Sequence, residues 1–150
     1  MSKICCPSRG RTYCSPEDFW LSVWKLAEGY KYLSKSSCPW DLMSFGGTAQ
    51  YLSHWDFVLS DGGPGRCFPS GHVSGAFALL GISFALRPVS AKLANQVLIT
   101  VLVIGGILGA GQVVRGAHFV SHVTYSAWIC WLICFASDQL RGKFSPNALS

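Results

Sequence analysis

The pattern of hydrophobic and polar residues changes near Phe68. The residues before it are rich in Ser, Gly, Cys and Pro, whereas three long apolar segments follow it, at Val73–Leu86, Leu93–Val114 and Phe119–Ala136. A helix needs about 17–25 apolar residues to cross the hydrocarbon core of a bilayer, and the second and third segments meet that need. The first reaches span length only if residues 69–72 begin its helix. We therefore expect an all-α fold, an integral membrane helical bundle with about three transmembrane helices.

A further helix is predicted near the N-terminus, at Glu17–Lys35. Charged residues interrupt its apolar positions too often for a membrane span, but its tryptophans and lysines favour the boundary between lipid and water. We therefore expect an N-terminal interfacial helix. Residues 36–67 then form a long loop, and loops of this length in a compact protein are usually functional or disordered. The 150 residues are expected to form a single membrane-embedded domain, 1–150.

The second apolar segment contains glycines at positions 105, 106, 109 and 111. Small residues at such spacing allow a neighbouring helix to approach closely. Glycine is also common in membrane helices for no such reason, and the sequence does not choose between the two interpretations.

Composition supports a membrane protein. Hydrophobic residues make up 50% of the chain and charged residues 13%, whereas a soluble domain carries about a quarter charged residues. The net charge is +5, but no basic run is interleaved with aromatic residues, so no nucleic-acid partner is expected. The odd number of cysteines and the absence of paired C-x-x-C spacing disfavour both a disulfide framework and a metal site. The seven are Cys5, Cys6, Cys14, Cys38, Cys67, Cys130 and Cys134.

The basic residues also predict an orientation in the membrane. If three helices cross in succession, residues 69–72 and 115–122 lie on one side of the membrane. The other side then carries Arg87, Lys92, Arg141 and Lys143. The positive-inside rule makes that second side cytoplasmic, so the end with the histidines faces outward.

The candidate catalytic and phosphate-binding residues lie at the outward ends of the apolar segments: His72, His118, His122, Arg66 and Arg115. Ionisable residues at membrane depth are costly and count as functional candidates. The first apolar helix opens with Ser-Gly-His, and the free N–H groups and positive dipole of a helix N-terminus bind anions. The serine could equally be an ordinary N-cap, and the two roles are compatible.

His118 and His122 are four residues apart and share one helix face. This spacing occurs in zinc sites too, but the glutamate of H-E-x-x-H is absent, since Phe119 holds that position. Arg115, about one turn earlier, would clamp a phosphate and repel a divalent metal. The group therefore fits a phosphate better than a metal.

Three segments resemble the motifs of the type 2 phosphatidic acid phosphatase superfamily. Phe68-Pro-Ser-Gly-His72 matches the central P-S-G-H motif, and Gly116-Ala-His118-Phe-Val-Ser121 matches the third motif, G-x-H-[FY]-x-S-[DH]. Lys31, six residues, then Cys38-Pro39 looks like the first motif, Lys-x6-Arg-Pro. The region from Cys38 to His72 also resembles a membrane-bound bacterial branch of this superfamily, which is related to acid phosphatases and vanadium haloperoxidases. The resemblance covers residues 31 to about 136.

The resemblance implies a lipid phosphate phosphatase that works through a phosphohistidine, with no metal and no other cofactor. His118 would attack phosphorus, while His72 would protonate the leaving alkoxide and then activate water. Lys31, Ser70 and Gly71 would hold the non-bridging oxygens, where fixed donors stabilise the charge of phosphoryl transfer. The implied partners are the bilayer and a membrane lipid that bears a phosphate monoester or a diphosphate. The implied location is the bacterial inner membrane, with the site facing the periplasm or exterior.

Two arginines of the family pattern are missing. Cys38 replaces the arginine of the first motif, and Gln112 replaces that of the third. We expect Arg66 and Arg115 to bind the phosphate in their place, because each lies next to a motif and has no evident acidic partner in the sequence.

A third departure concerns His122, which stands where most members have the aspartate that orients the nucleophilic histidine. A neutral His122 can accept the Nδ1–H hydrogen bond of His118 but brings no negative charge, so it is predicted as a third catalytic residue. Acidic alternatives in the loop are Asp41, Asp56 and Asp61.

Two other hypotheses stay open. A catalytically impaired or truncated relative with a structural or interaction role would explain the three departures, and also three spans where membrane members usually have a six-helix core. A vanadium-dependent haloperoxidase would bind vanadate in such a pocket, but those relatives are typically soluble and much larger. Neither the identity of the lipid nor the oligomeric state follows from the sequence.

Overall fold

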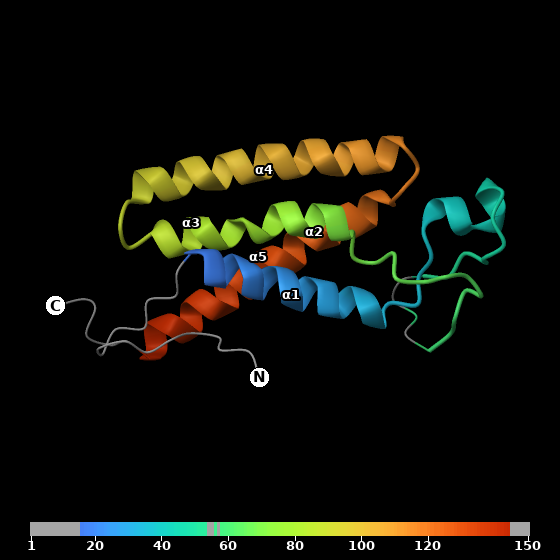
Figure 1. Ribbon diagram of the computed structural model, residues 1–150, viewed down its shortest axis with the longest axis horizontal. Coiled ribbons are helices and arrows are strands. Elements are labelled where there is room, and N and C mark those ends of the chain that lie inside the picture. The colour runs from blue at the N-terminus through green and yellow to red at the C-terminus, as the bar shows by residue number, and fades with distance from the viewer. Residues whose placement is uncertain (1–15, 54–55, 57, 145–150) are drawn as a thin grey trace.

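Helices run lengthwise along the molecule and pack as a bundle, with the long loop gathered at one end (Figure 1). The computed structural model describes residues 16–53, 56 and 58–144. Cys5, Cys6 and Cys14 lie outside these residues. Among the described residues no strand is formed, which confirms the all-α class. The elements are α1 (Pro16–Leu33), η1 (Pro39–Asp41), η2 (Met43–Phe45), α2 (Gly71–Ala78), α3 (Leu80–Leu86), α4 (Ala91–Val114) and α5 (Val120–Phe144).

Two helices, α4 and α5, are long and apolar enough to cross a membrane, over Ala91–Val114 and Val120–Gln139. The first predicted span is shorter, because its helical region covers Gly71–Leu86 and is divided at Leu79 into α2 and α3. Hydrogen bonds between residues three apart tighten the chain there, from the N–H of Leu79 and to its carbonyl. This divided segment occupies the middle of the bundle, where α1, α4 and α5 surround it.

Glycines allow α4 to pack closely against its neighbours. A Cβ added at Gly105 would lie 2.6 Å from the Phe77 ring of α2, and one at Gly109 would lie 2.5 Å from Val123 of α5. Gly106 and Gly111 face open space. The close-approach interpretation therefore holds for two of the four glycines. The outward face of α4 is apolar and exposed, as in a helix that contacts lipid, at Ile99, Leu102, Val103, Ile104, Ile107 and Leu108.

The N-terminal helix α1 forms one wall of the bundle (Figure 1). Val23 and Ala27 are fully buried in the core, and the Trp20 indole donates a hydrogen bond to the Gly75 carbonyl of α2 at 3.5 Å. The exposed positions Trp24, Leu26 and Tyr30 give this helix an apolar outer face as well. This packing places the end of α1, and with it Lys31, beside the start of α2.

Polar and covalent links within the loop between α1 and α2 hold its two ends together. Buried Asp61 accepts hydrogen bonds from the main chain and the hydroxyl of Ser37. Cys38 and Cys67 form a disulfide, so the expectation that the cysteines make no such framework is wrong for this pair. The loop brings together two residues 29 positions apart, which no local spacing reveals. Cys130 and Cys134 are free and buried in the helical core.

Candidate active site

His118 is positioned by the end of α4. Gly116 adopts a left-handed conformation, with φ of 71°, and the Ala117 N–H donates to the Gln112 carbonyl at 2.9 Å. The Gly116 N–H also donates to the Val113 carbonyl, so the turn is a Schellman motif, which favours glycine at this position. The Gln112 carbonyl accepts a further hydrogen bond from the His118 N–H. This short turn presents His118 between the two candidate spans.

The second part of the site is the start of α2. A Cβ added at Gly71 would lie 2.6 Å from Lys31 Nζ and 2.9 Å from the Glu28 carboxylate, so both side chains of α1 reach this helix end. N–H groups in the first turn of a helix have no intrahelical acceptor and point along its axis. Lys31 therefore adds a positive charge beside these free N–H groups, and its role in binding phosphate stays a prediction. Glu28 adds a negative charge at the same place, which the sequence did not lead us to expect.

Ser70 occupies the N-cap position of α2, but its side chain makes no capping hydrogen bond. The hydroxyl is buried and has no partner among the described residues. The main chain of Ser70 is held instead by Ser126 of α5, whose hydroxyl accepts from the Ser70 N–H at 2.9 Å and donates to the His122 carbonyl at 2.7 Å. The ordinary capping role is thus absent, and the hydroxyl is free to bind a ligand oxygen.

Positive charge and burial together lower the pKa of His118. Its side chain is only 8% exposed. The pKa of His118 is lowered from 6.5 to about 4. The causes are desolvation first and then the nearby charges of Lys31, His72 and Arg115 in that order, against a hydrogen bond with the Cys67 main chain that raises the pKa. Four of the predicted site residues, from α1, α2 and the turn after α4, are therefore close enough to interact. His118 is neutral near pH 7, as a nucleophile must be.

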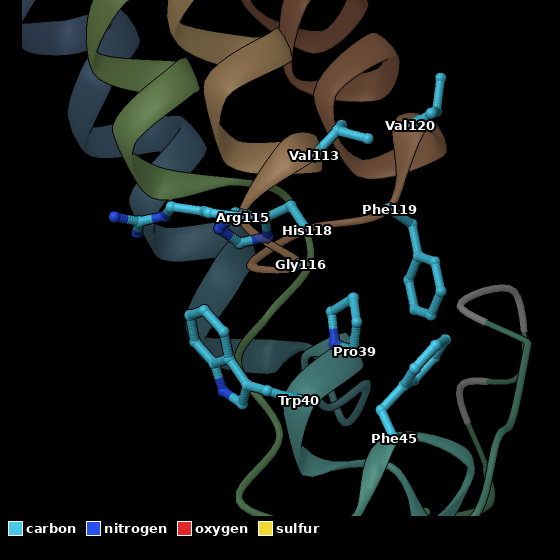
Figure 2. A pocket seen from close by; sticks show the side chains of 9 residues that line it. All are labelled: Pro39, Trp40, Phe45, Val113, Arg115, Gly116, His118, Phe119 and Val120. Atoms are coloured by element: carbon cyan, nitrogen blue, oxygen red, sulfur yellow. The ribbon is translucent and has the colours of Figure 1, made fainter.

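A pocket of about 370 Å³ opens beside His118. Figure 2 shows Phe119 and Phe45 pointing toward one another across it, with Trp40 of η1 on another side. The Arg115 side chain extends away from these rings. The lining is mostly apolar, and its remaining members are Pro39, Val113, Gly116 and Val120.

The Nδ1 atom of His118 faces the disulfide rather than His122. Cys67 Sγ lies 3.2 Å from His118 Nδ1, whereas the ring centres of His118 and His122 are 6.0 Å apart. An imidazole nitrogen lies about 1.1 Å from its ring centre, so the two rings leave more than about 3.5 Å between nitrogens, too far for a direct hydrogen bond. The expected contact between them is therefore not present. His122 is buried and packs edge-on against Phe68 and Phe119.

The other predicted residues are placed outside this group. The Arg66 guanidinium lies over the Tyr32 ring, 5.4 Å from its centre, and is exposed. The loop carboxylates serve the loop itself: Asp41 accepts from the Cys38 N–H, Asp56 from the N–H groups that follow it, and Asp61 from Ser37. The Gln112 side chain is buried in the bundle, where the family has an arginine.

The cysteines and histidine near the site make a poor metal site. The ligand atoms of Cys38, Cys67 and His118 lie within 4.8 Å of one another. Metals bind cysteine as the thiolate, and both sulfurs are joined in the disulfide. The residues present therefore favour an anion over a cation.

Sequence reasoning missed three residues that the structure places at the site: Glu28, Cys67 and Ser126. Two of them had a periodic signal, because Glu28 precedes Lys31 by one helical turn and Ser126 follows His122 by one turn. For Cys67 the only signal in the sequence was its place next to the central P-S-G-H motif. Its contact depends on the folding of the whole loop.

A comparison with known protein families found a match. A family model described as the PAP2 superfamily matches residues 21–145. No curated protein and no solved structure matches the chain. The matched range includes all three motifs, together with Lys31, Cys67, His72 and Arg115.

Proposed function

The chain belongs to the PAP2 superfamily, whose members are generally phosphatases, and from this premise we propose that it hydrolyses the phosphate ester or diphosphate of a membrane lipid through a phosphohistidine at His118. The observation that carries the proposal is the convergence of Lys31, His72 and Arg115 on neutral, buried His118. Three cationic or protonatable groups around one nucleophile favour a substrate with two negative charges. Phosphoryl transfer depends mainly on such positioning and charge stabilisation.

The reaction would proceed in two balanced steps. Nε2 of His118 attacks the terminal phosphorus, and the bond from phosphorus to the leaving oxygen breaks. The leaving group, an alkoxide from an ester or the lipid monophosphate from a diphosphate, takes a proton from His72. Water then attacks the phosphohistidine, gives a proton back to His72, and releases phosphate and free His118. Lys31, the Ser70 hydroxyl and the Gly71 N–H would hold the non-bridging oxygens in both steps. Arg66 and His122 stay predictions, the first as a phosphate ligand and the second as the residue that orients His118 in place of the family's aspartate.

Two features support a lipid over a soluble phosphate ester. The pocket beside His118 is lined mainly by aromatic and aliphatic side chains, which suits the apolar part of a leaving alcohol. It also lies where the two membrane-length helices α4 and α5 meet, so a lipid lying in the bilayer would have its phosphate near His118.

The disulfide supports the predicted outward orientation. Disulfides persist in oxidising compartments such as the periplasm and are rare where thiols are kept reduced. Cys38–Cys67 lies at the His118 end of the bundle, the end that the positive-inside rule places outside. Thiol labelling of single cysteines introduced at positions 65 and 90 of a cysteine-depleted variant tests this. Position 65 should react from the outside, and reaction there only from the cytoplasm would reverse the orientation.

The direct test of activity is phosphate release by the purified protein from phosphatidate, phosphatidylglycerol phosphate and a polyprenyl diphosphate, with His118→Ala as the control. At least one lipid should be hydrolysed by the parent chain and none by the variant. Release at equal rates by both would contradict the role of His118. No release by the parent from any lipid would favour the catalytically impaired relative.

A further inference from the structure

We propose that the Cys38–Cys67 disulfide is a positioning element for catalysis, which holds the Nδ1–H tautomer of His118 and leaves Nε2 free to attack. This rests on the proposed function, since it assigns to the disulfide the orienting task of the aspartate that most family members carry. It also gives a reason for Cys38, which replaces an arginine of the first motif: Cys38 is the covalent partner of the sulfur that contacts the nucleophile.

The contact is direct and sheltered from water. Cys67 Sγ lies 3.2 Å from His118 Nδ1, Cys67 is 1% exposed and His118 8% exposed. The Cys67 main chain also forms a hydrogen bond that raises the pKa of His118, which identifies the main-chain group as an acceptor of a ring N–H. Cys67 therefore offers acceptors from both its side chain and its main chain.

The oxidation state of the sulfur decides what it can do. A disulfide sulfur carries no hydrogen, so it can only accept, and the proton between it and the ring must belong to Nδ1. A neutral imidazole holds one proton, so Nε2 then carries the lone pair that attacks phosphorus. The geometry leaves this task to Cys67, through its disulfide sulfur and its main-chain acceptor, because the His122 ring is too distant for a direct hydrogen bond and the three loop carboxylates bind elsewhere.

Reduction would remove the part of this constraint that the disulfide sulfur supplies and would leave only the main-chain acceptor of Cys67. Dithiothreitol supplies two electrons and two protons, becoming a cyclic disulfide, while Cys38 and Cys67 each become a thiol. A Cys67 thiol can donate its hydrogen to Nδ1, which favours the tautomer with the proton on Nε2. The single tautomer is then lost, and the nucleophile is protonated at its attacking atom for part of the time.

The tautomer of His118 can be measured without a substrate. The full chain, with Cys5, Cys6 and Cys14 changed to serine, is labelled with ¹⁵N-histidine, and its four histidines are followed by ¹⁵N NMR in detergent. A His118→Gln spectrum assigns the signal. We expect a protonated Nδ1 and a bare Nε2 in the oxidised protein, and loss of this pattern after dithiothreitol. The kcat for phosphate release should fall about tenfold or more, with KM changed less than about threefold.

Two variants separate positioning from loop stability. Cys38→Ala leaves a Cys67 thiol without any reductant and should reproduce the reduced spectrum. Asp61→Asn weakens the loop hydrogen bonds to Ser37 but keeps the disulfide, so it should keep the oxidised tautomer even if the protein melts earlier. The same His118 tautomer in oxidised, reduced and Cys38→Ala protein, or a protonated Nε2 in the oxidised protein, overturns the proposal. Failure of the oxidised protein to release phosphate from any lipid contradicts the proposed function alone, because the tautomer measurement needs no turnover.

Discussion

Gly71→Ala should reduce catalysis without reducing stability. The added Cβ would lie 2.6 Å from Lys31 Nζ and 2.9 Å from the Glu28 carboxylate. Carbon and nitrogen atoms in ordinary contact are about 3.5–4.0 Å apart, so the Lys31 ammonium must move away from the start of α2 by about 1 Å. A flexible lysine can make that shift at little cost in folding free energy.

The expected loss follows from that displacement. A shift of about 1 Å in a group that holds the reacting phosphate can cost about 100-fold in rate, which corresponds to about 2.7 kcal/mol of transition-state free energy. Alanine is also a better helix residue than glycine, by roughly 0.5–1 kcal/mol, so the melting temperature should stay equal or rise slightly. Phosphate release and thermal unfolding of the same preparation measure both quantities.

Gly75→Ala is the matched control. It adds a Cβ to the same helix one turn later, where the nearest atom, Trp24 Nε1, is 3.9 Å away. Activity of this variant should stay within about twofold of the parent, as for a substitution in ordinary contact. If Gly71→Ala kept full activity, or if both alanine variants lost it equally, Lys31 would not hold the phosphate at this helix end.

Three further outcomes are expected. Lys31→Gln removes a charge that lowers the pKa of His118, so the acid limb of kcat/KM should move to higher pH. In the parent protein the pKa of folded His118 is about 4, below its usual 6.5. The contribution of His118 to stability is therefore present above pH 6.5 and is lost as pH falls through 4. Glu28→Gln removes a negative charge beside the start of α2 and should tighten inhibition by inorganic phosphate several-fold. Unchanged inhibition would show that Glu28 does not act on the bound phosphate. His122→Ala opens a cavity under the His118 turn and should lower the rate at least about tenfold, whereas rates within twofold in both His122→Ala and His122→Asp would remove His122 from the site.

The sequence was sufficient to predict the helices and the helix ends that carry the three motifs. Apolar runs predicted α4 to within two residues and the start of α5 to within one, since these breaks are local properties of the chain, but α5 continues eight residues beyond the predicted end at Ala136. Three short motifs predicted that His72 and His118 would meet at one end of the bundle, because each motif adjoins the end of a predicted helix. The division of the helix at Leu79 was not predicted, since Leu79 lies between Ala78 and Leu80 and the nearest glycine, Gly81, is two residues later.

The group that contacts Nδ1 of His118 could not be predicted, because that contact depends on the tertiary structure. The His118 and His122 positions share a helix face by periodicity, but His118 precedes the first residue of α5 and sits in the turn, so the four-residue rule does not apply to their rings. The disulfide depends on how a loop of some thirty residues folds back on the bundle. Arg66 was expected at the phosphate because of its charge, yet its guanidinium packs on Tyr32.

The central claim is that His118 carries the phosphoryl group during turnover. The measurement that tests it most directly is a rapid quench of the protein with whichever lipid of the panel is hydrolysed fastest, carrying a radiolabelled phosphate, followed by mapping of the labelled peptide. The account predicts a label that is stable in alkali, is lost in acid, lies on the peptide containing His118, and forms and decays at rates consistent with kcat. A label on another residue, or single-turnover phosphate release without any protein-bound label, would contradict it.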